Sequence, residues 1–369
     1  GKTYTAFQII WRLWKSGAKK RILFLADRNI LIDQTMVNDF RPFKGAMAKL
    51  SPNAKGVERV DAQGSVTIDD VDLAVNKSTK LVDKSYEIYL SLYQAVTGTE
   101  EESNIYKQFS PDFFNLIIVD ECHHVGAVSF DAILKRTKAK YVLGLTATPI
   151  RRDGQQPIIF MQCGPIRYMA AKPAGAPRDL EVLPRSRFGR IDVPTDAGIQ
   201  DVFRHLANDS ARTAAIAAEV RDAVAQGRKV LVLTERTEHL DAIKTELDSL
   251  QPAPFVLHGR MSRKQRATLV ADLDALPPDA PRVLLSIGKL VGEGFDHPPL
   301  DTLVLAMPVS WRGTLQQYAG RLHREHASKT DVRIIDFVDT GHPALLRMWD
   351  KRQRGYRAMG YRISSEDLK

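Results

Sequence analysis

The amino-acid sequence predicts an α/β protein with two domains, each built around a parallel sheet. Its 369 residues suffice for two domains of roughly 150 to 200 residues, each able to bury its own core. Short apolar runs alternate with stretches of helical periodicity in both halves of the chain, as strands and helices do in α/β folds. We therefore expect a first domain over residues 1–170, a linker over residues 171–205 and a second domain over residues 206–369.

The first expected domain begins with a helix over residues 4–15, because Phe7, Ile10, Trp11 and Trp14 fall on one helical face. Residues 41–84 are polar and weakly patterned, which indicates a loop-rich insertion with short strands. Four other segments have the character of strands, and we expect them at residues 21–26, 86–93, 116–119 and 141–145.

The second expected domain follows a change in composition. Pro, Ala, Gly and Arg are frequent in residues 170–190, which is typical of a linker. An Ala-rich stretch over residues 211–225 then predicts a helix. Strands separated by helical stretches are expected at residues 230–233, 255–257, 283–286, 302–306 and 332–337, and this alternation again indicates a parallel sheet.

The composition is ordinary for a globular protein, with 44% hydrophobic and 26% charged residues. Lys and Arg number 53 against 44 Asp and Glu, so the net charge of +9 favours polyanionic partners, although net charge alone reports only non-specific association. No run of about 18 apolar residues predicts a membrane-spanning helix. Two cysteines, Cys122 and Cys163, suit a reduced cytoplasmic compartment, and Cys163 is expected to lie in the core without a partner.

The chain begins Gly1-Lys2-Thr3, which looks like the last part of the phosphate-binding pattern G-x-x-x-x-G-K-[ST]. In that pattern Gly allows close backbone approach, Lys contacts phosphates and the hydroxyl binds Mg²⁺. The alternative is a chance occurrence, since three residues are a weak signal. The helix expected next favours the phosphate loop, and we then expect a fragment that lacks the preceding strand and is itself a poor ATPase.

Polar residues follow the expected strands, where parallel sheets bind ligands. Asp120 and Glu121 could hold Mg²⁺ and polarise a water, or could be a solvated acidic pair. Thr146 and Thr148 could bond this acidic cluster or simply belong to a turn. Residues 292–296 could bring backbone amides and a carboxylate to the same place.

A further group of polar residues lies near the C-terminus. Arg321 and Arg324 are three apart in an expected helix and would share a face, a pattern suited to the γ-phosphate. The alternative is a pair of surface arginines. Residues 347–362 mix basic residues with Trp349, Tyr356 and Tyr361, and these aromatics are expected to pack on the core rather than to stack on bases.

Taken in order, these strings resemble those of a superfamily 2 helicase or translocase across almost the whole chain. Motifs I, Ia and Ib match Gly1-Lys2-Thr3, Leu25-Ala26-Asp27-Arg28 and Tyr93-Gln94. Motifs II and III match Asp120-Glu121-Cys122-His123 and Thr146-Ala147-Thr148. Motifs IV, V and VI match residues 230–236, 292–296 and 317–324.

The finer resemblance divides along the chain. Residues 21–120 look like the motor subunit of type I restriction enzymes, whereas the segments FDAILKRTKAKYVLGLTATPIRRDG and KRQRGYRAMGY look more like XPB-like repair helicases. Arg151-Arg152-Asp153 departs from the Arg-Glu-Asp element of that second class, which puts its role in doubt. One family combines both traits, or the chain is a composite.

The resemblance implies two RecA-like domains with ATP in the cleft between them. Gly1 and Lys2 would contact phosphates, Thr3 and Asp120 would hold Mg²⁺, and Glu121 would activate water. Arg321 and Arg324 would act as arginine fingers. The nucleotide would also meet Gly294 and Asp296, and the residues that couple its state to nucleic-acid grip would be Gln317, His123, Thr146, Thr148 and Asp296.

The resemblance also implies a nucleic-acid partner, for which duplex DNA is favoured and RNA is an alternative. The phosphate contacts would be Arg28, Gln94, Arg260, Arg263 and Lys264. Such contacts position a nucleic acid without reading its sequence, which suits a motor. Methylation and specificity subunits of a restriction complex are further possible partners. The alternative from a different class is a non-catalytic nucleic-acid-binding fragment.

Overall fold

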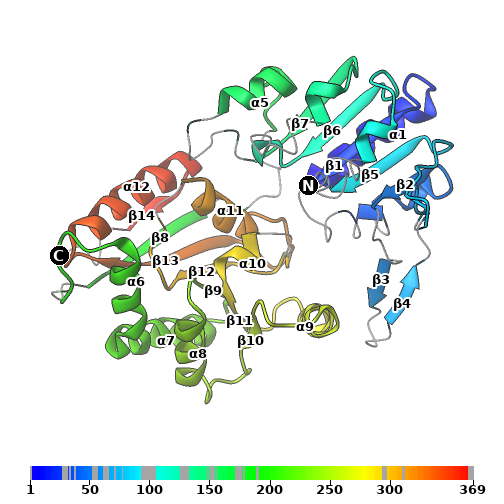
Figure 1. Ribbon diagram of the computed structural model, residues 1–369. Helices are drawn as coiled ribbons and strands as arrows, with labels where there is room; N and C mark the ends of the chain where they lie inside the picture. The colour runs from blue at the N-terminus through cyan, green and yellow to red at the C-terminus, as the bar shows by residue number, and fades with distance from the viewer. Residues whose placement is uncertain are drawn as a thin grey trace. The chain divides into compact units, whose positions relative to one another are not determined.

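The computed structural model describes residues 2–26, 32, 35–36, 39–51, 57–60, 66–69, 72–76, 78–92, 105–124, 133–147, 149, 154, 156–170, 177, 179–187, 191–292, 297–309 and 312–364. The chain forms two compact units (Figure 1). The first unit is built from Gly1–Asp61 and Ser65–Met169, and the second unit contains Ala170–Lys369.

The first unit contains a five-stranded sheet in the order β2-β5-β1-β6-β7. Every pairing in this sheet is parallel, as the sequence predicts. The strands are β1 (Ile22–Ala26), β2 (Met47–Leu50), β5 (Ile88–Leu92), β6 (Leu116–Asp120) and β7 (Tyr141–Leu145). The segment expected to be a loop-rich insertion supplies β2 to this sheet and a separate antiparallel pair, β3 (Val57–Val60) and β4 (Val66–Asp69).

Both faces of this sheet are covered. Alternate residues of β1 point to opposite faces, so Phe24 packs with the helix α1 (Lys2–Lys15) and Leu25 packs in a second cluster. The helix α5 (Gln156–Cys163) contributes Ile159 to that second cluster. Short 3₁₀ turns complete the unit at η1 (Arg41–Phe43), η3 (Ile105–Gln108) and η4 (Cys122–His124).

The second unit contains a seven-stranded sheet, again with parallel pairings only, in the order β10-β11-β9-β12-β13-β8-β14. Its strands are β8 (Asp179–Arg187), β9 (Lys229–Thr234), β10 (Phe255–Leu257), β11 (Arg282–Ile287), β12 (Thr302–Leu305), β13 (Asp331–Asp339) and β14 (Arg362–Ile363). The expected parallel sheet of the second half is therefore confirmed.

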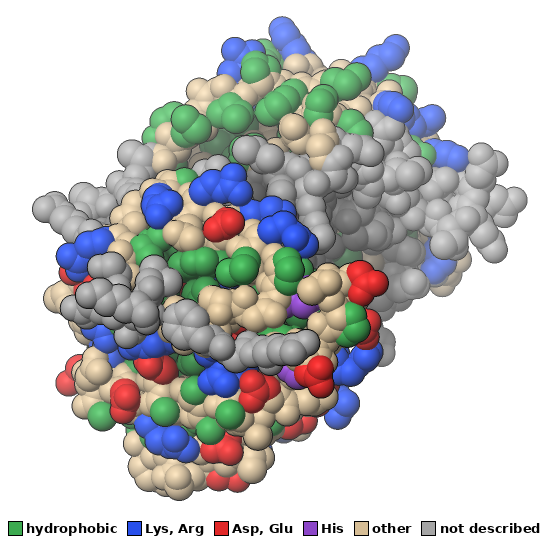
Figure 2. All heavy atoms as spheres, turned by 90° about the vertical axis from the view of Figure 1, so that its left-hand side faces the viewer, with side chains coloured by type: hydrophobic (Ala, Val, Ile, Leu, Met, Phe, Trp, Pro, Cys, Tyr) green, Lys and Arg blue, Asp and Glu red, His purple; other side chains and the backbone are tan. Residues whose placement is uncertain are grey.

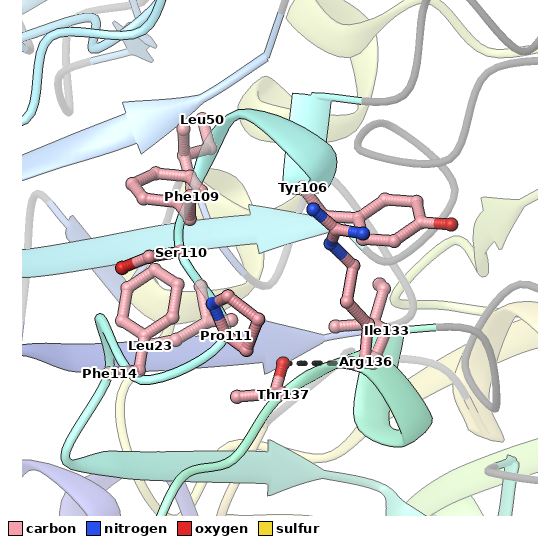
Figure 3. A pocket seen from close by; sticks show the side chains of 10 residues that line it. All are labelled: Leu23, Leu50, Tyr106, Phe109, Ser110, Pro111, Phe114, Ile133, Arg136 and Thr137. Atoms are coloured by element: carbon pink, nitrogen blue, oxygen red, sulfur yellow. Dashed lines mark hydrogen bonds between the residues drawn. The ribbon is translucent and has the colours of Figure 1, made fainter.

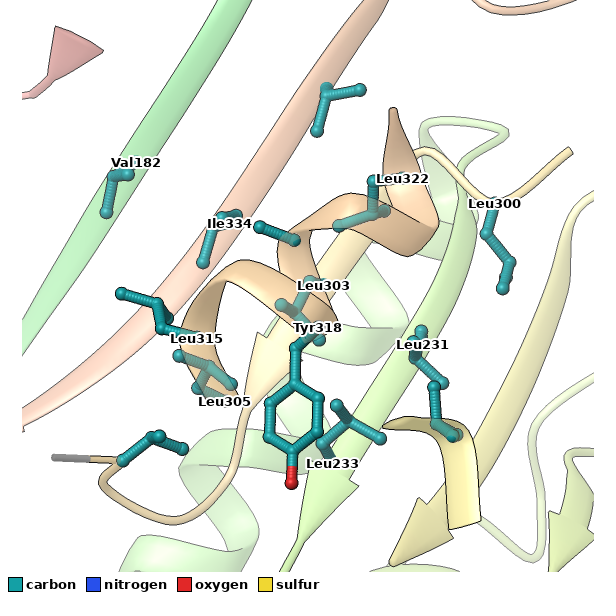
Figure 4. Close-up of a cluster of buried hydrophobic side chains, with 14 of the residues drawn as sticks. Val182, Leu231, Leu233, Leu300, Leu303, Leu305, Leu315, Tyr318, Leu322 and Ile334 are labelled. Atoms are coloured by element: carbon teal, nitrogen blue, oxygen red, sulfur yellow. The ribbon is translucent and has the colours of Figure 1, made fainter. Parts of the chain in front are cut away.

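Helices pack on both faces of this second sheet. Val283 and Leu285 of β11 pack with α7 (Ser210–Ala225) and α8 (Thr237–Glu246), whereas Leu284 packs on the other face with α11 (Arg312–Leu322). Figure 4 shows the apolar cluster on the α11 side of this sheet. The remaining helices are α6 (Ile199–Asn208), α9 (Arg263–Ala275), α10 (Gly288–Gly292) and α12 (Pro343–Met359).

The range expected to be a linker differs from expectation, because it contains β8 and α6. Leu180 and Val182 alternate with less buried residues, and β8 pairs along its whole length with β13. The Pro- and Arg-rich composition concealed this half-buried alternation. At the C-terminus, by contrast, the expected packing of Trp349, Tyr356 and Tyr361 on the core is confirmed, since all three are buried.

A hollow lies on the face of the first sheet that η3 covers (Figure 3). Phe109 and Phe114 contribute to its apolar wall, and Tyr106 and Arg136 also line it. None of the candidate site residues lines it. Among the described residues, no helix combines the length and apolar character needed to cross a membrane.

Candidate active site

Two adjacent strand ends in the first unit bring together four of the residues singled out in the sequence. β6 and β7 are parallel neighbours with Asp120 opposite Leu145, so the residues that follow them emerge at the same edge of the sheet. Glu121 and His123 follow β6, and Thr146 follows β7. Lys2, in the first turn of α1, reaches the same edge.

Glu121 adopts a left-handed backbone conformation with φ of 52°. A non-glycine residue pays about 1 to 3 kcal/mol for such a conformation, which is typical of functional sites. Its backbone N–H donates to Asp120 Oδ1 at 3.0 Å, which stabilises the turn out of β6. The conformation directs the carboxylate toward Lys2, whose Nζ donates to Oε1 at 2.5 Å. The carboxylate of Glu121 therefore contacts Lys2, whereas that of Asp120 accepts from the backbone of the turn.

The carboxylate of Glu121 lies among cationic and polar groups. Burial alone would raise its pKa, but a hydrogen bond from His123 and the charge of Lys2 outweigh burial and lower the pKa to about 2. His123 Nδ1 lies 3.4 Å from Glu121 Oε2. Glu121 is consequently ionised at neutral pH in this state and is a weak base while Lys2 remains its partner.

His123 also contacts the next strand end. Its Nδ1 lies 2.9 Å from Thr146 Oγ1, so the ring joins the turn after β6 to the turn after β7. The sequence predicted that Thr146 could bond the acidic cluster, and the contact runs through His123. A displacement of Glu121 would therefore reach Thr146 through one side chain.

The side chains that could meet a metal ion are hard oxygen donors. Asp120 is buried, with 3% of its surface exposed, and its position at the end of β6 sets its carboxyl group at the same sheet edge. Thr3 lies in the first turn of α1. Among the described residues, no group of three His, Cys, Asp or Glu side chains could hold a metal. Mg²⁺ at nucleotide sites typically uses one or two carboxylates together with phosphates and water, and this donor set fits that pattern.

The 3₁₀ turn η4, which follows Glu121, and the helix α5 pack closely against β7 at Gly144. A side chain at Gly144 of β7 would come within 2.8 Å of Cys122 Sγ and 3.0 Å of Cys163 Cβ. Gly144 therefore lets η4 and α5 approach the strand. Cys163 is a free cysteine that packs beside Cys122 against the apolar cluster, but it is only partly buried, so its expected place in the core is confirmed only in part.

The second unit presents its candidate residues on and after α11. Gln317 and Arg321 lie within the helix and are half-buried. Arg324 lies in the turn after the helix, which ends at Leu322, so the shared helical face expected for Arg321 and Arg324 is not formed. Lys329 stabilises this end of the helix, since its Nζ donates to the carbonyls of Leu322 and Arg324, at 2.8 and 3.0 Å.

The proposed nucleic-acid contacts are only partly visible. Arg260 and Lys264 are exposed, the first before α9 and the second in its first turn. The position of Arg263 is described but its side chain is not. The other two predicted nucleic-acid contacts, Arg28 and Gln94, lie outside the described residues. So do four candidates with other predicted roles, namely Gly1, Thr148, Gly294 and Asp296.

Sequence reasoning missed two residues that hold this machinery in place. Lys329 satisfies the carbonyls at the end of α11, and Glu235 accepts a hydrogen bond from Tyr318 of the same helix at 3.0 Å. Neither residue belongs to a short motif with its partner. The sequence shows only a lysine, Lys329, after the expected helix and a carboxylate, Glu235, near the end of an expected strand. It does not indicate the partner of either residue.

The family models that match the chain cover most of it in two parts. Residues 1–151 match the model described as "Type III restriction enzyme, res subunit", and residues 212–326 match the "Helicase conserved C-terminal domain". These ranges contain the Lys2–Glu121 site and the α11 residues, respectively.

Three similar proteins illustrate the relationship. A type I restriction enzyme EcoAI endonuclease subunit of Escherichia coli is 50% identical over 153 residues, which are 40% of this chain and 15% of that protein. A protein of Acanthamoeba polyphaga mimivirus described as the ATP-dependent RNA helicase L396 is 22% identical over 79% of this chain and 56% of its own length. A Vibrio vulnificus protein described as the HsdR subunit of a type I restriction enzyme, solved as a fragment, is 25% identical with a TM-score of 0.62, over 93% of this chain and 58% of that chain.

The two parallel sheets, the strand-end site and these matches define the class of protein. The chain belongs to the superfamily 2 helicases, and its two units are RecA-like domains. Within that superfamily it resembles the motor subunit of type I restriction enzymes. It spans between 15% and 58% of the lengths of the three relatives named above.

Proposed function

We propose that this chain is the ATP-hydrolysing motor of a protein that moves along duplex DNA. The observation that carries the proposal is the pairing of Lys2 with Glu121 at the edge of a parallel sheet, at 2.5 Å. We assign these residues to motifs I and II of a superfamily 2 helicase, which their sequence strings resemble. Superfamily members use ATP, and the arrangement offers a cation for phosphates beside a carboxylate for water.

The residues of the first unit have distinct proposed roles. ATP phosphates would replace Glu121 as the partner of Lys2, and Gly1 would allow the backbone to approach them. Glu121, released from the ammonium, would become a stronger base and would orient and deprotonate the attacking water. Thr3 and Asp120 would hold Mg²⁺, which neutralises phosphate charge when bound.

The second unit would supply charge to the transition state. We propose that Arg321 and Arg324 contact the γ-phosphate, where negative charge accumulates during transfer. Gln317 and Asp296 would link this contact to the nucleic acid, and Gly294 would approach the nucleotide. His123, Thr146 and Thr148 would pass the state of the nucleotide to the first unit's nucleic-acid contacts. Hinge closure on ATP and opening after hydrolysis would move the strand.

Duplex DNA is the proposed track because of a relative that is 50% identical over 153 residues. That relative is described as a restriction endonuclease subunit, and such enzymes act on DNA. Exposed Arg260 and Lys264, together with Arg28, Gln94 and Arg263, would contact phosphates without reading bases. Methylation and specificity subunits of a restriction complex are the proposed protein partners.

A second candidate function is that of an RNA helicase. The mimivirus protein described as an RNA helicase is similar over 79% of this chain, a broader match than that of the restriction subunit. The identity is lower, at 22%, and the shared region is the motor itself, which serves both kinds of nucleic acid. We therefore favour DNA.

The test is ATP turnover by the natural protein that contains this sequence. Turnover is measured alone and with linear duplex DNA, single-stranded DNA or RNA, for the wild type and for Glu121→Gln. Strong stimulation by duplex DNA that Glu121→Gln abolishes would support the proposal. Stimulation by single strands or RNA alone would favour the helicase alternative, and nucleic-acid binding without any turnover would favour a binding module.

A further inference from the structure

A hydrogen bond joins α11 to the end of β9 in the second unit. The hydroxyl of Tyr318 donates to Glu235 Oε1 at 3.0 Å across 83 residues of sequence. Tyr318 is buried, with 3% of its surface exposed, and Glu235 is the first residue after β9. Figure 4 shows the Tyr318 side chain extending from α11 beside Leu233 of β9, with its hydroxyl at the end of the apolar cluster.

A glycine that directly follows the neighbouring strand makes room for this bond: Gly288 is the first residue of α10, after the end of β11. β9 and β11 are paired in parallel with Ile287 opposite Thr234, so Gly288 and Glu235 follow a matched pair at the same sheet edge. A Cβ at Gly288 would overlap the Tyr318 hydroxyl and would lie 2.6 Å from Glu235 Oε1. Real Cβ contacts are not that short, so any larger residue at this position would displace the tyrosine.

The surroundings favour a neutral tyrosine donating to a carboxylate. Burial raises the pKa of Tyr318, and the adjacent negative charge of Glu235 raises it further. Glu235 as a whole residue is exposed; desolvation of its carboxyl group raises its pKa, and the hydrogen bond from the tyrosine hydroxyl partly offsets the increase. The phenol therefore keeps its proton at neutral pH, and the bond has one fixed donor.

Tyr318 is well placed to control the position of Arg321. The two residues are three apart in α11, so they lie on the same side of the helix. A shift or rotation of the helix that followed loss of the Tyr318 bond would move the guanidinium with it. Misplacement of a positioned group by about 1 Å costs roughly 100-fold in rate in well-ordered active sites.

We propose that Glu235 is a positioning residue that, through Tyr318, fixes the register of α11 and so the aim of Arg321. The inference rests on the proposed ATP-hydrolysing function. Gly288 is the third member of this latch, which we define as Glu235, Gly288 and Tyr318. The latch joins the ends of two neighbouring strands to the helix that carries the arginine.

The experiment separates positioning from folding by kinetic parameters. ATP turnover of the natural protein is measured with saturating duplex DNA for Tyr318→Phe, Glu235→Ala and Glu235→Gln. The first two should lower kcat about tenfold while KM for ATP changes less than about twofold, because the loss affects the transition state. Glu235→Gln keeps an oxygen that can accept from Tyr318, and it should recover kcat to within about threefold of the wild type.

The matched control is Glu238→Ala, which removes a nearby carboxylate that pairs with Arg236 instead. It should leave both parameters within about twofold of the wild type. The double variant Glu235→Ala, Tyr318→Phe should be no slower than either single variant, since one bond is lost in all three. A purely structural bond would lower the melting temperature without this split between kcat and KM.

Two results would overturn the inference, and they differ from each other. An active wild type with an unchanged kcat in Tyr318→Phe would overturn the positioning role alone. A natural protein without ATP turnover under any nucleic acid would overturn the proposed function and the positioning role together.

Discussion

The two units hold their candidate side chains in opposite ways. In the first unit, Lys2 and Glu121 form an ion pair whose side chains are 32% and 23% exposed. In the second unit, α11 is held by Tyr318, which is 3% exposed, and by Lys329, which is 9% exposed. The first arrangement is a partly exposed ion pair, and a charged ligand can reach it. In the second arrangement the side chains of Tyr318 and Lys329 are buried, although Glu235, the acceptor of the tyrosine hydrogen bond, is exposed.

This difference indicates which side of the machinery changes during a cycle. An anionic phosphate can compete with Glu121 for the ammonium of Lys2, because both present oxygen and negative charge. No ligand can compete for Lys329, because its partners are backbone carbonyls at a buried helix end. We therefore expect the first unit to rearrange its side chains on ATP binding while α11 moves as a rigid part of the second unit.

The largest effect is expected from neutralising Glu121, the residue that we propose activates the attacking water. Glu121→Gln should lower ATP turnover by about 100-fold to 10,000-fold, the range typical of a general base. Steady-state phosphate release with saturating duplex DNA measures this. A variant that retains more than a tenth of wild-type turnover would assign Glu121 to the Lys2 pair alone.

The second prediction tests the rigidity of the second unit. Asp336 is fully buried, accepts from Arg352 Nε and Tyr356 Oη at 2.7 Å each, and anchors α12 to β13. Asp336→Asn leaves Arg352 buried without a counter-charge and should cost about 3 to 5 kcal/mol. Urea unfolding measures the loss. Asp350→Asn, on the exposed face of the same helix, should change stability by less than about 0.5 kcal/mol.

The third prediction concerns the acid sensitivity of the first unit. The folded pKa of Glu121 is about 2 against an ordinary value of 4.5, so its stabilising contribution is complete above pH 4.5 and is lost as the pH falls toward 2. Because Lys2 supplies part of this shift, Lys2→Met should make unfolding less acid-sensitive. Between pH 7 and pH 3 the wild type should lose about 1 to 2 kcal/mol more than the variant. Equal losses would mean that the ion pair is not populated in solution.

The smallest effect is expected at the contact that joins the two strand ends. Thr146→Ala removes the hydroxyl 2.9 Å from His123 Nδ1 and should cost about 1 kcal/mol. It should also weaken the stimulation of ATP turnover by duplex DNA by about threefold to tenfold, since the link from Glu121 is cut. Thr137→Ala is the control, because its hydroxyl bonds only the carbonyl of Ile133. Equal stimulation in both variants would argue against coupling through His123.

Local patterns predicted the parts of this molecule that local sequence determines. The apolar run that ends in Asp120 and Glu121 predicts both the strand and the chemistry at its end. The spacing also predicts a helix over residues 4–15, directly after the phosphate-loop residues, and α1 begins two residues earlier, at Lys2. Parallel strands place such ends at one edge, so the meeting of Lys2 with Glu121 follows from topology.

The remaining features depend on distant contacts that the sequence does not reveal. The end of α11 is stabilised by Lys329, whose carbonyl partners lie five and seven residues upstream of it in a turn that no pattern predicts. The Pro- and Arg-rich composition around β8 indicated a linker instead of a strand. The pairing that makes β8 a strand is with β13, more than 150 residues away, and local sequence does not reveal it. The latch needs Gly288, which follows β11, to leave room for the bond between Tyr318 of α11 and Glu235, which follows β9.

We expect ATP to replace Glu121 as the partner of Lys2, and equilibrium ATP binding by Glu121→Gln tests this exchange. Binding is measured by titration of the natural protein with a fluorescent ATP analogue in the presence of Mg²⁺. We expect the variant to bind the analogue as tightly as the wild type or up to about tenfold more tightly, because neutralising Glu121 weakens its competition for the ammonium of Lys2. Binding weakened more than about tenfold would contradict it, since Glu121 would then hold the nucleotide rather than compete with it.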